Sequence, residues 1–250
     1  MSPLDAIAIL AAGVAAGTIN TIVGSGTLIT FPVLIGLGWA PVVANVSNNI
    51  GLVPGAFTGV VGYRRELEGQ RSHVLSLAPF TAVGAVAGAV ALLVLPASAF
   101  KAIVPAFIAV AIALVAFQPR INAALAHRRR PGAENRVGLR GATVATGVYG
   151  GYFGAAQGIL LMALFGVALP QDLQRSNALK NLLAMTANLV AGIVFIFAAD
   201  VDWGVVGLIA AGSILGGYLG SRYGRRLSQD RLRALIVVVG IAAIARLLFG

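Results

Sequence analysis

The chain has 250 residues, of which 58% are hydrophobic and 10% are charged, and its mean hydropathy is +0.91. A soluble domain carries about 25% charged residues, so this composition excludes a soluble globular protein. The formal net charge of +10 is compatible with nucleic-acid binding, but fourteen of the eighteen Lys and Arg lie in segments 64–73, 118–140 and 222–233, between apolar runs. The positive-inside rule places such segments in cytoplasmic loops. We therefore predict a multi-pass protein of the cell (plasma) membrane, partnered by the lipid bilayer and not by nucleic acid.

Broken and unbroken apolar stretches alternate along the chain. The first stretch, residues 5–37, is interrupted at Gly24-Ser25-Gly26, and spans follow at 42–63, 74–95 and 100–117. A basic linker at 119–140 leads to a second interrupted stretch, 141–168, and to spans at 176–199, 204–221 and 234–249. Apolar runs of about twenty residues are typical of transmembrane helices, and the alternation of a membrane β-barrel is missing. The predicted fold class is an all-α polytopic membrane protein.

The basic loops also predict how the interrupted stretches cross the membrane. With residue 140 inside and the acidic turn at 200–203 outside, the chain must cross an odd number of times between them. Since 176–199 is a full span, 141–168 must return to the side from which it entered. Its arms reach only ~16–22 Å as helices, short of the ~30 Å hydrocarbon core. We predict a re-entrant hairpin here and, by analogy, another at 5–37 from the outer side. An alternative makes 5–37 one long tilted span with the N-terminus inside.

A polar pattern repeats after 132 residues, because Asn45, Asn48 and Asn49 recur as Asn177, Lys180 and Asn181. Asparagine is rare in apolar segments, so this match indicates two copies of one unit, 1–118 and 141–250. Each unit crosses an odd number of times, which predicts two inverted repeats, each a broken re-entrant hairpin plus three transmembrane helices. Rows of glycine at 84 and 88, and at 212, 216 and 220, are predicted to be helix-packing faces between repeats or between subunits of a homo-oligomer.

Several kinds of chemistry are excluded by the residues that the chain lacks. It contains no cysteine, and His73 and His127 lie in predicted loops, so we expect no disulfide, metal site or cofactor. All eight Asp and Glu lie at termini or in loops, which leaves no carboxylate relay at membrane depth. No nucleophile–base pair or phosphate loop is present, so we expect no enzyme. The N-terminus lacks the cationic start of a signal peptide, so we expect the first stretch to stay in the mature protein.

The helix breaks and the two asparagine faces form the candidate site for a small anionic substrate. Glycine leaves backbone amides uncovered, and returning helices that begin at the breaks would point their positive ends at one central anion. The candidate substrate-binding residues are Asn20, Gly24, Ser25, Gly26, Thr27, Asn45, Asn48, Asn49, Tyr152, Gln157, Gly158, Asn177, Lys180 and Asn181. Lys180 would place a formal charge inside a helix; alternatively, its side chain snorkels to the inner surface beyond Arg175. The glycines and asparagines have an alternative role in helix packing.

The segment from Gly24 to Asn45 resembles the signature of the TauE/SafE sulfite exporter family. That pattern has a glycine-rich run, a Leu-Leu-x-Pro matched at Pro32, a Leu-Gly matched at Leu37-Gly38, and then a proline and an alanine, matched at Pro41 and Ala44. The second half repeats it more weakly as Gly154-Ala-Ala-Gln-Gly158-Ile-Leu160, followed by Gly166 and Pro170. Two positions depart from the family: Asn45-Val46-Ser47 replaces its Gly-Thr-Ser, and Leu164 stands where the second motif has a proline.

The resemblance covers the whole chain and implies a multi-pass plasma-membrane protein that moves sulfite, sulfoacetate or related sulfur oxoanions and organosulfonates. We therefore expect a secondary transporter of small anions that works by alternating access around a midplane site, with export as the expected direction. The alternatives are a passive anion channel, which the same helix dipoles would serve, and an uptake carrier for another small organic anion.

Overall fold

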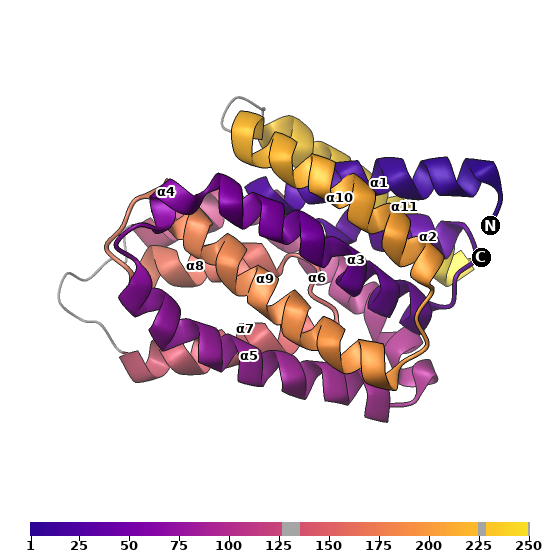
Figure 1. The fold of residues 1–250 in the computed structure, drawn as a ribbon, viewed down its shortest axis with the longest axis horizontal. Helices are drawn as coiled ribbons and strands as arrows, with labels where there is room; N and C mark the ends of the chain where they lie inside the picture. Colours follow the sequence, from indigo (N-terminus) through magenta and orange to yellow (C-terminus); the bar gives the residue numbers. More distant parts are fainter. Residues whose placement is uncertain (127–135, 225–228, 250) are drawn as a thin grey trace.

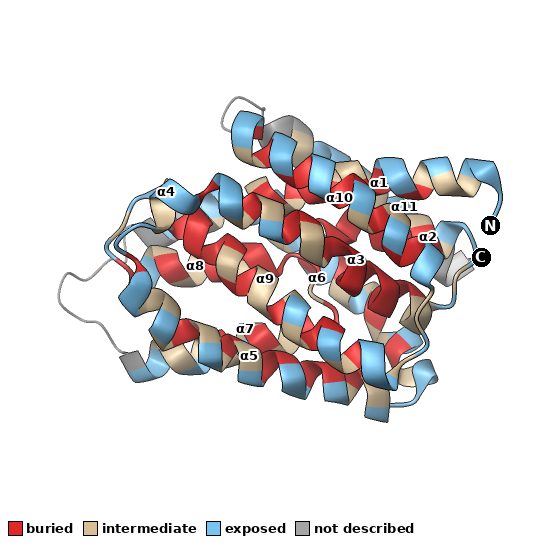
Figure 2. Cartoon of the chain, in the orientation of Figure 1, coloured by how far each residue is buried: buried red, intermediate tan, exposed pale blue. Residues whose placement is uncertain are grey.

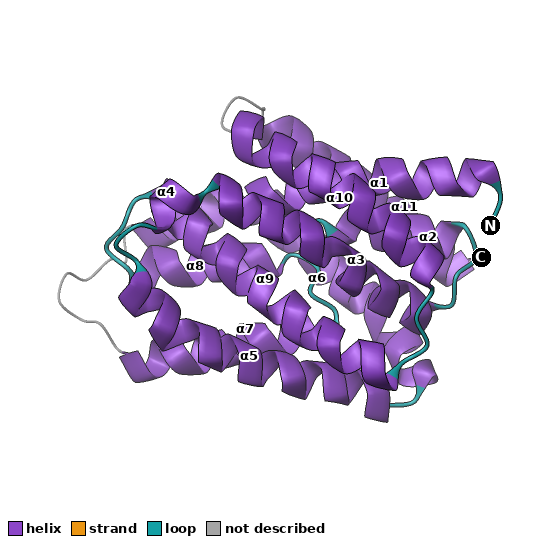
Figure 3. Cartoon of the chain, in the orientation of Figure 1, coloured by secondary structure: helices purple, strands orange, loops and turns teal. Residues whose placement is uncertain are grey.

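The structure is a computed structural model that describes residues 1–126, 136–224 and 229–249. These residues form α-helices joined by loops, and no strand occurs among them (Figure 1, Figure 3). The helices are α1 (Pro3–Ile22), α2 (Thr27–Gly36), α3 (Pro41–Gly62), α4 (Arg64–Leu67), α5 (Arg71–Val94), α6 (Ala97–Ala126), α7 (Arg136–Tyr152), α8 (Gln157–Ala168), α9 (Leu173–Ala198), α10 (Trp203–Tyr223) and α11 (Gln229–Phe249). The all-α fold class predicted from the sequence is confirmed.

Within the described part of the chain, five helices are long and apolar enough to cross a membrane. They are Pro3–Ile22, Arg71–Val94, Ala97–Ile121, Leu173–Ala198 and Trp203–Tyr223. The twenty residues of α1 cover about 30 Å. This helix is therefore longer than the arms predicted for the interrupted stretch 141–168. The helices α2 and α8 are shorter apolar helices. Buried residues gather on the inner helices and on the facing sides of the outer ones (Figure 2).

The helices of the two halves start in the same register. From α3 to α9, from α5 to α10 and from α6 to α11, the first residues lie 132 positions apart. This is the spacing of the repeated asparagine pattern. Two helices extend into the predicted linker 119–140, since α6 continues to Ala126 and α7 begins at Arg136. The remainder of that linker, including His127, lies outside the described residues.

The glycine rows pack helices of one half against helices of the other. A Cβ on Gly216 of α10 would lie 2.1 Å from the Val14 oxygen of α1, and a Cβ on Gly88 of α5 would lie 2.0 Å from the Val148 oxygen of α7. Such backbone approach requires residues without a side chain. The hydroxyl of Thr18 also donates to the Gly216 oxygen at 3.1 Å. The rows therefore join α1 to α10 and α5 to α7.

Both ends of the α1–α2 pair lie beside the start of α10, at what we call the Asp202 end of the bundle. The Met1 side chain reaches Gly204, and the Trp39 indole donates to the Asp202 carboxylate at 2.8 Å. The chain therefore enters and returns at the same end of the bundle between residues 1 and 39. The Trp39 indole holds the pKa of Asp202 below its usual range, while partial burial acts in the opposite direction.

Both ends of the α7–α8 pair lie at the opposite end of the bundle, which we call the arginine end. There Arg140 of α7 donates to the Ser76 hydroxyl near the start of α5, at 3.3 Å. After α8, the Arg175 carbonyl at the start of α9 accepts from the Gln70 amide at 2.9 Å. The two broken pairs therefore open toward different ends of the same bundle.

Cysteine labelling tests on which side of the membrane each end lies. Ser98→Cys changes an exposed residue at the start of α6, and Asp200→Cys changes an exposed residue of the α9–α10 turn. Glu68→Cys changes an exposed residue of the first basic loop. In intact cells, an impermeant thiol reagent is expected to label the first two variants and to label Glu68→Cys only after permeabilisation. The native chain offers no competing thiol. Labelling of Glu68→Cys in intact cells would reverse the assignment of the basic loops to the cytoplasm.

Candidate functional site

The two helix breaks meet inside the bundle. The Gly158 amide donates to the Gly24 oxygen at 3.1 Å, and a Cβ on Gly24 would lie 2.4 Å from the Gly158 Cα. Gly24 has a φ of 84° and its repeat partner Ala156 has a φ of 62°, so both breaks turn through the left-handed region that favours glycine. The sequence predicted free amides at both tips, but the Gly158 amide is occupied by its contact with the other break.

Amides at the first break remain available. In the described part of the chain, the N–H groups of Ser25, Gly26 and Thr27 donate no hydrogen bond. These residues precede or begin α2, whose first amides have no partner within the helix. The Ser25 hydroxyl is buried and also has no hydrogen-bond partner among the described residues. The start of α2 therefore presents unused donors inside the protein, next to Gly158.

Lys180 is fully buried, and its side chain does not snorkel to the surface. Its ammonium donates to the backbone oxygens of Asn20 at 3.1 Å and Thr21 at 3.3 Å. These oxygens belong to the last turn of α1, which has no further intrahelical donors and carries the negative end of the helix dipole. The aliphatic part of the side chain packs against Gly158. Lys180 thus links the end of α1 to the second break.

The asparagines on α9 also bind the end of α1. The side-chain amides of Asn177 and Asn181 donate to the Thr21 oxygen at 3.3 and 3.2 Å. Together with Lys180, they form one polar helix face, as their spacing predicts. The donor groups of this face are used by backbone carbonyls, while the Asn177 side-chain oxygen is buried without a hydrogen-bond partner among the described residues.

The equivalent face of α3 binds residues of both halves of the protein. The Asn45 amide donates to the oxygen of Tyr152, the last residue of α7, at 2.9 Å. Asn48 donates to the Thr27 hydroxyl at 3.3 Å and accepts from the Thr30 hydroxyl. Thus α3 caps α7, and α9 caps α1. Asn49 donates instead to Asn188 of α9, at 3.4 Å.

The remaining predicted residues lie at the second break. Gln157 is buried, and its side-chain amide donates to the Thr146 oxygen of α7 at 3.1 Å. This hydrogen bond links α8 to α7, so the amide is not a free donor for a ligand. The Tyr149 hydroxyl donates to the Ala155 oxygen. The Tyr152 hydroxyl is buried without a hydrogen-bond partner in the described part of the chain, and its ring packs against Phe100 and Phe107.

Sequence reasoning missed four polar partners of the site: Thr21, Thr30, Tyr149 and Asn188. Asn188 had a usable signal, because it is another asparagine in an apolar span. Thr30 lies one turn after Gly26, which places its hydroxyl near the break. Thr21 takes part mainly through its backbone oxygen, which no pattern of side chains indicates.

Helices of spanning length around a buried cluster of amides, hydroxyls and one ammonium define a polytopic helical membrane protein with a polar centre. A family model described as "Sulfite exporter TauE/SafE" matches residues 9–247. The chain belongs to this family, and it is a membrane transporter of the TauE/SafE type. The resemblance seen in the sequence is thereby confirmed.

Similar proteins carry the same general description. The chain is 30% identical over 234 residues to the probable membrane transporter protein ORF9 of a Sinorhizobium species, covering 93% of this chain and 88% of that protein. It is 27% identical over 253 residues to the probable membrane transporter protein YfcA of Escherichia coli, covering 100% and 91%. A probable membrane transporter protein of Haemophilus influenzae is 26% identical over 255 residues, covering 98% and 96%. No solved structure matches the chain significantly.

Proposed function

We propose that this protein is a secondary transporter of small anions, with sulfur oxoanions and organosulfonates as its substrate class and export as its direction. The observation that carries this proposal is the fully buried ammonium of Lys180. Within the described residues its hydrogen bonds go to carbonyl oxygens, and none goes to a carboxylate. Burying a cation without a counter-ion costs several kcal/mol, and an anionic substrate would supply that counter-ion.

Neighbouring groups favour an oxyanion as the substrate. The unused amides of Ser25, Gly26 and Thr27 lie at the start of α2, where the helix dipole also attracts negative charge. The partnerless Ser25 hydroxyl adds a further donor. Several N–H and O–H donors that lie close together suit the several oxygens of a sulfite or sulfonate group. The family description, which names a sulfite exporter, supports the same substrate class and direction.

The proposed mechanism is alternating access between two inverted halves. Each half contributes a broken helix pair that is capped by a polar face of the other half, so the halves can rock around the contact between Gly24 and Gly158. Opening at the Asp202 end would separate Trp39 from Asp202. Opening at the arginine end would separate Gln70 from Arg175. Because these links lie at opposite ends, one can break while the other holds the bundle closed.

Flux into proteoliposomes tests this function. We expect saturable uptake of radiolabelled sulfite or sulfoacetate, and a several-fold acceleration when the same anion is loaded on the opposite side. Thiosulfate and small carboxylates complete the panel and define selectivity. A channel would give flux without trans-stimulation. Trans-stimulated flux of carboxylates alone would identify a carrier for another organic anion and would overturn the proposed substrate class.

A further inference from the structure

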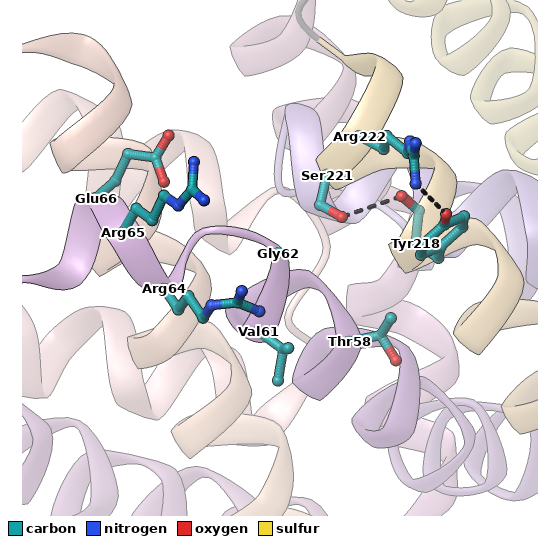
Figure 4. Close-up of a pocket in the computed structure, with 9 residues that line it drawn as sticks. All are labelled: Thr58, Val61, Gly62, Arg64, Arg65, Glu66, Tyr218, Ser221 and Arg222. Atoms are coloured by element: carbon teal, nitrogen blue, oxygen red, sulfur yellow. Dashed lines mark hydrogen bonds between the residues drawn. The ribbon is translucent and has the colours of Figure 1, made fainter.

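A second polar feature lies at the arginine end, apart from the buried centre. There a pocket of about 650 Å³ separates the last turn of α3 and the short helix α4 from the last turn of α10 (Figure 4). Its lining includes the three arginines Arg64, Arg65 and Arg222 and the hydroxyl residues Thr58, Tyr218 and Ser221. None of these residues belongs to the candidate substrate site. The pocket is built from both halves of the chain.

The pocket has the chemistry of a phosphate-binding site. Guanidinium groups bind phosphate through paired N–H donors, and Glu66 is the acidic residue of the lining, so positive charge predominates. Arg222 is held in place, because it donates to the Tyr218 hydroxyl at 2.6 Å and its guanidinium lies 5.8 Å from the centre of the Tyr218 ring. Figure 4 shows this contact on the α10 side of the pocket, with the two arginines of α4 on the other side.

Exposed apolar side chains continue from the pocket along the helices. One turn before Val61 on α3 lies Phe57, which is 59% exposed, and one turn before Tyr218 on α10 lie Ile214 and Leu215, which are 43% and 57% exposed. A free inorganic anion would use only the arginines. A ligand with a charged head and an apolar tail would bind the arginines and these exposed apolar side chains at once. The turns of α3 and α10 that carry the apolar side chains lead from the pocket toward the middle of the proposed membrane spans.

We propose that this pocket binds the phosphate of an anionic phospholipid, whose acyl chains lie along the exposed side chains of α3 and α10. Basic pockets between transmembrane helices on the cytoplasmic side suit such headgroups. The site is independent of the transported anion. Because α3 and α4 come from one half and α10 from the other, the bound lipid would bridge the two halves at the end that must open.

Native mass spectrometry of the purified protein tests the proposal. Dioleoyl phosphatidylglycerol is the probe, and dioleoyl phosphatidylcholine, with the same chains and no net charge, is the reference lipid. Arg222→Gln is expected to lower phosphatidylglycerol affinity by about fivefold, since a basic residue near an anionic lipid contributes on the order of 1 kcal/mol. The double variant Arg64→Gln/Arg65→Gln is expected to lower it further, while phosphatidylcholine binding stays unchanged.

Arg71→Gln is the matched control, because Arg71 is an exposed arginine at the start of α5, close in the chain to Arg64 and Arg65, and does not line the pocket. It is expected to retain full phosphatidylglycerol binding. Monodispersity in detergent checks that each variant is folded, and Arg222→Lys, which keeps the charge, should bind with an intermediate affinity. An equal loss in Arg71→Gln and Arg222→Gln would overturn the proposal. Displacement of the lipid by millimolar inorganic phosphate would also overturn it and assign the pocket to a soluble anion.

Discussion

Gly158→Ala is expected to abolish transport, and Gly24→Ala is expected to do the same. A Cβ on Gly158 would lie 2.5 Å from the Gly24 Cα, and a Cβ on Gly24 would lie 2.4 Å from the Gly158 Cα. Both neighbours are backbone, so the two breaks would have to move apart. Gly24 also has a φ of 84°, which costs an alanine roughly 1–2 kcal/mol. The loss of contact would remove the point around which the halves are proposed to rock.

Gly207→Ala and Gly36→Ala are the matched controls for this experiment. A Cβ at either position meets no atom within 4 Å, so both variants should transport normally. The measurement is the rate of sulfite or sulfoacetate flux in proteoliposomes, divided by the amount of reconstituted protein. Normal flux in both Gly24→Ala and Gly158→Ala would exclude the helix breaks from the transport mechanism.

Lys180→Gln is expected to weaken substrate binding by about 1.5–3 kcal/mol, the range for hydrogen bonds to charged groups. The half-saturation concentration should then rise roughly tenfold or more. The variant keeps two N–H donors, one bond closer to the backbone than the ammonium, but loses the charge that a bound anion would neutralise. Binding is measured directly, by isothermal titration of the purified protein with sulfite and sulfoacetate, and thermal unfolding is recorded in parallel.

Two further variants separate the charge of Lys180 from its structural contacts. Lys180→Arg keeps the charge but replaces a compact ammonium with a planar fork, so it should restore binding only in part. Asn48→Ala removes the repeat partner of Lys180, a neutral group held by Thr27 and Thr30, and should weaken binding less than Lys180→Gln. If Lys180→Gln lowered only the unfolding temperature, with substrate affinity unchanged, the lysine would be a cap for α1 and no part of the binding site.

Local features of the sequence determined the class of protein and the positions of its helix breaks. Apolar runs predict helices because a chain in lipid must satisfy its backbone groups within each helix. Gly24 and Gly26 mark the first break because glycine favours a turn over continued helix, and Gly158 lies just after the second break, as the second residue of α8. The recurrence of Asn45 as Asn177 indicated the repeat, because polar groups in apolar spans are costly and are kept for a reason. These signals lie within single segments and can be read without knowing which helices touch.

The partners of the polar groups were decided only by the tertiary structure. Lys180 binds the oxygens of Asn20 and Thr21, which lie some 160 positions away in the chain, and the spacing of side chains along α9 cannot identify a backbone acceptor on α1. For the same reason the sequence could not decide whether the Lys180 side chain lies in the centre of the protein or reaches the surface. It also predicted a free amide at Gly158, which the structure shows bonded to Gly24. The fold brings the last turn of α1 to α9 and the last residue of α7 to α3, and that arrangement determines which donors are occupied and which remain for a ligand.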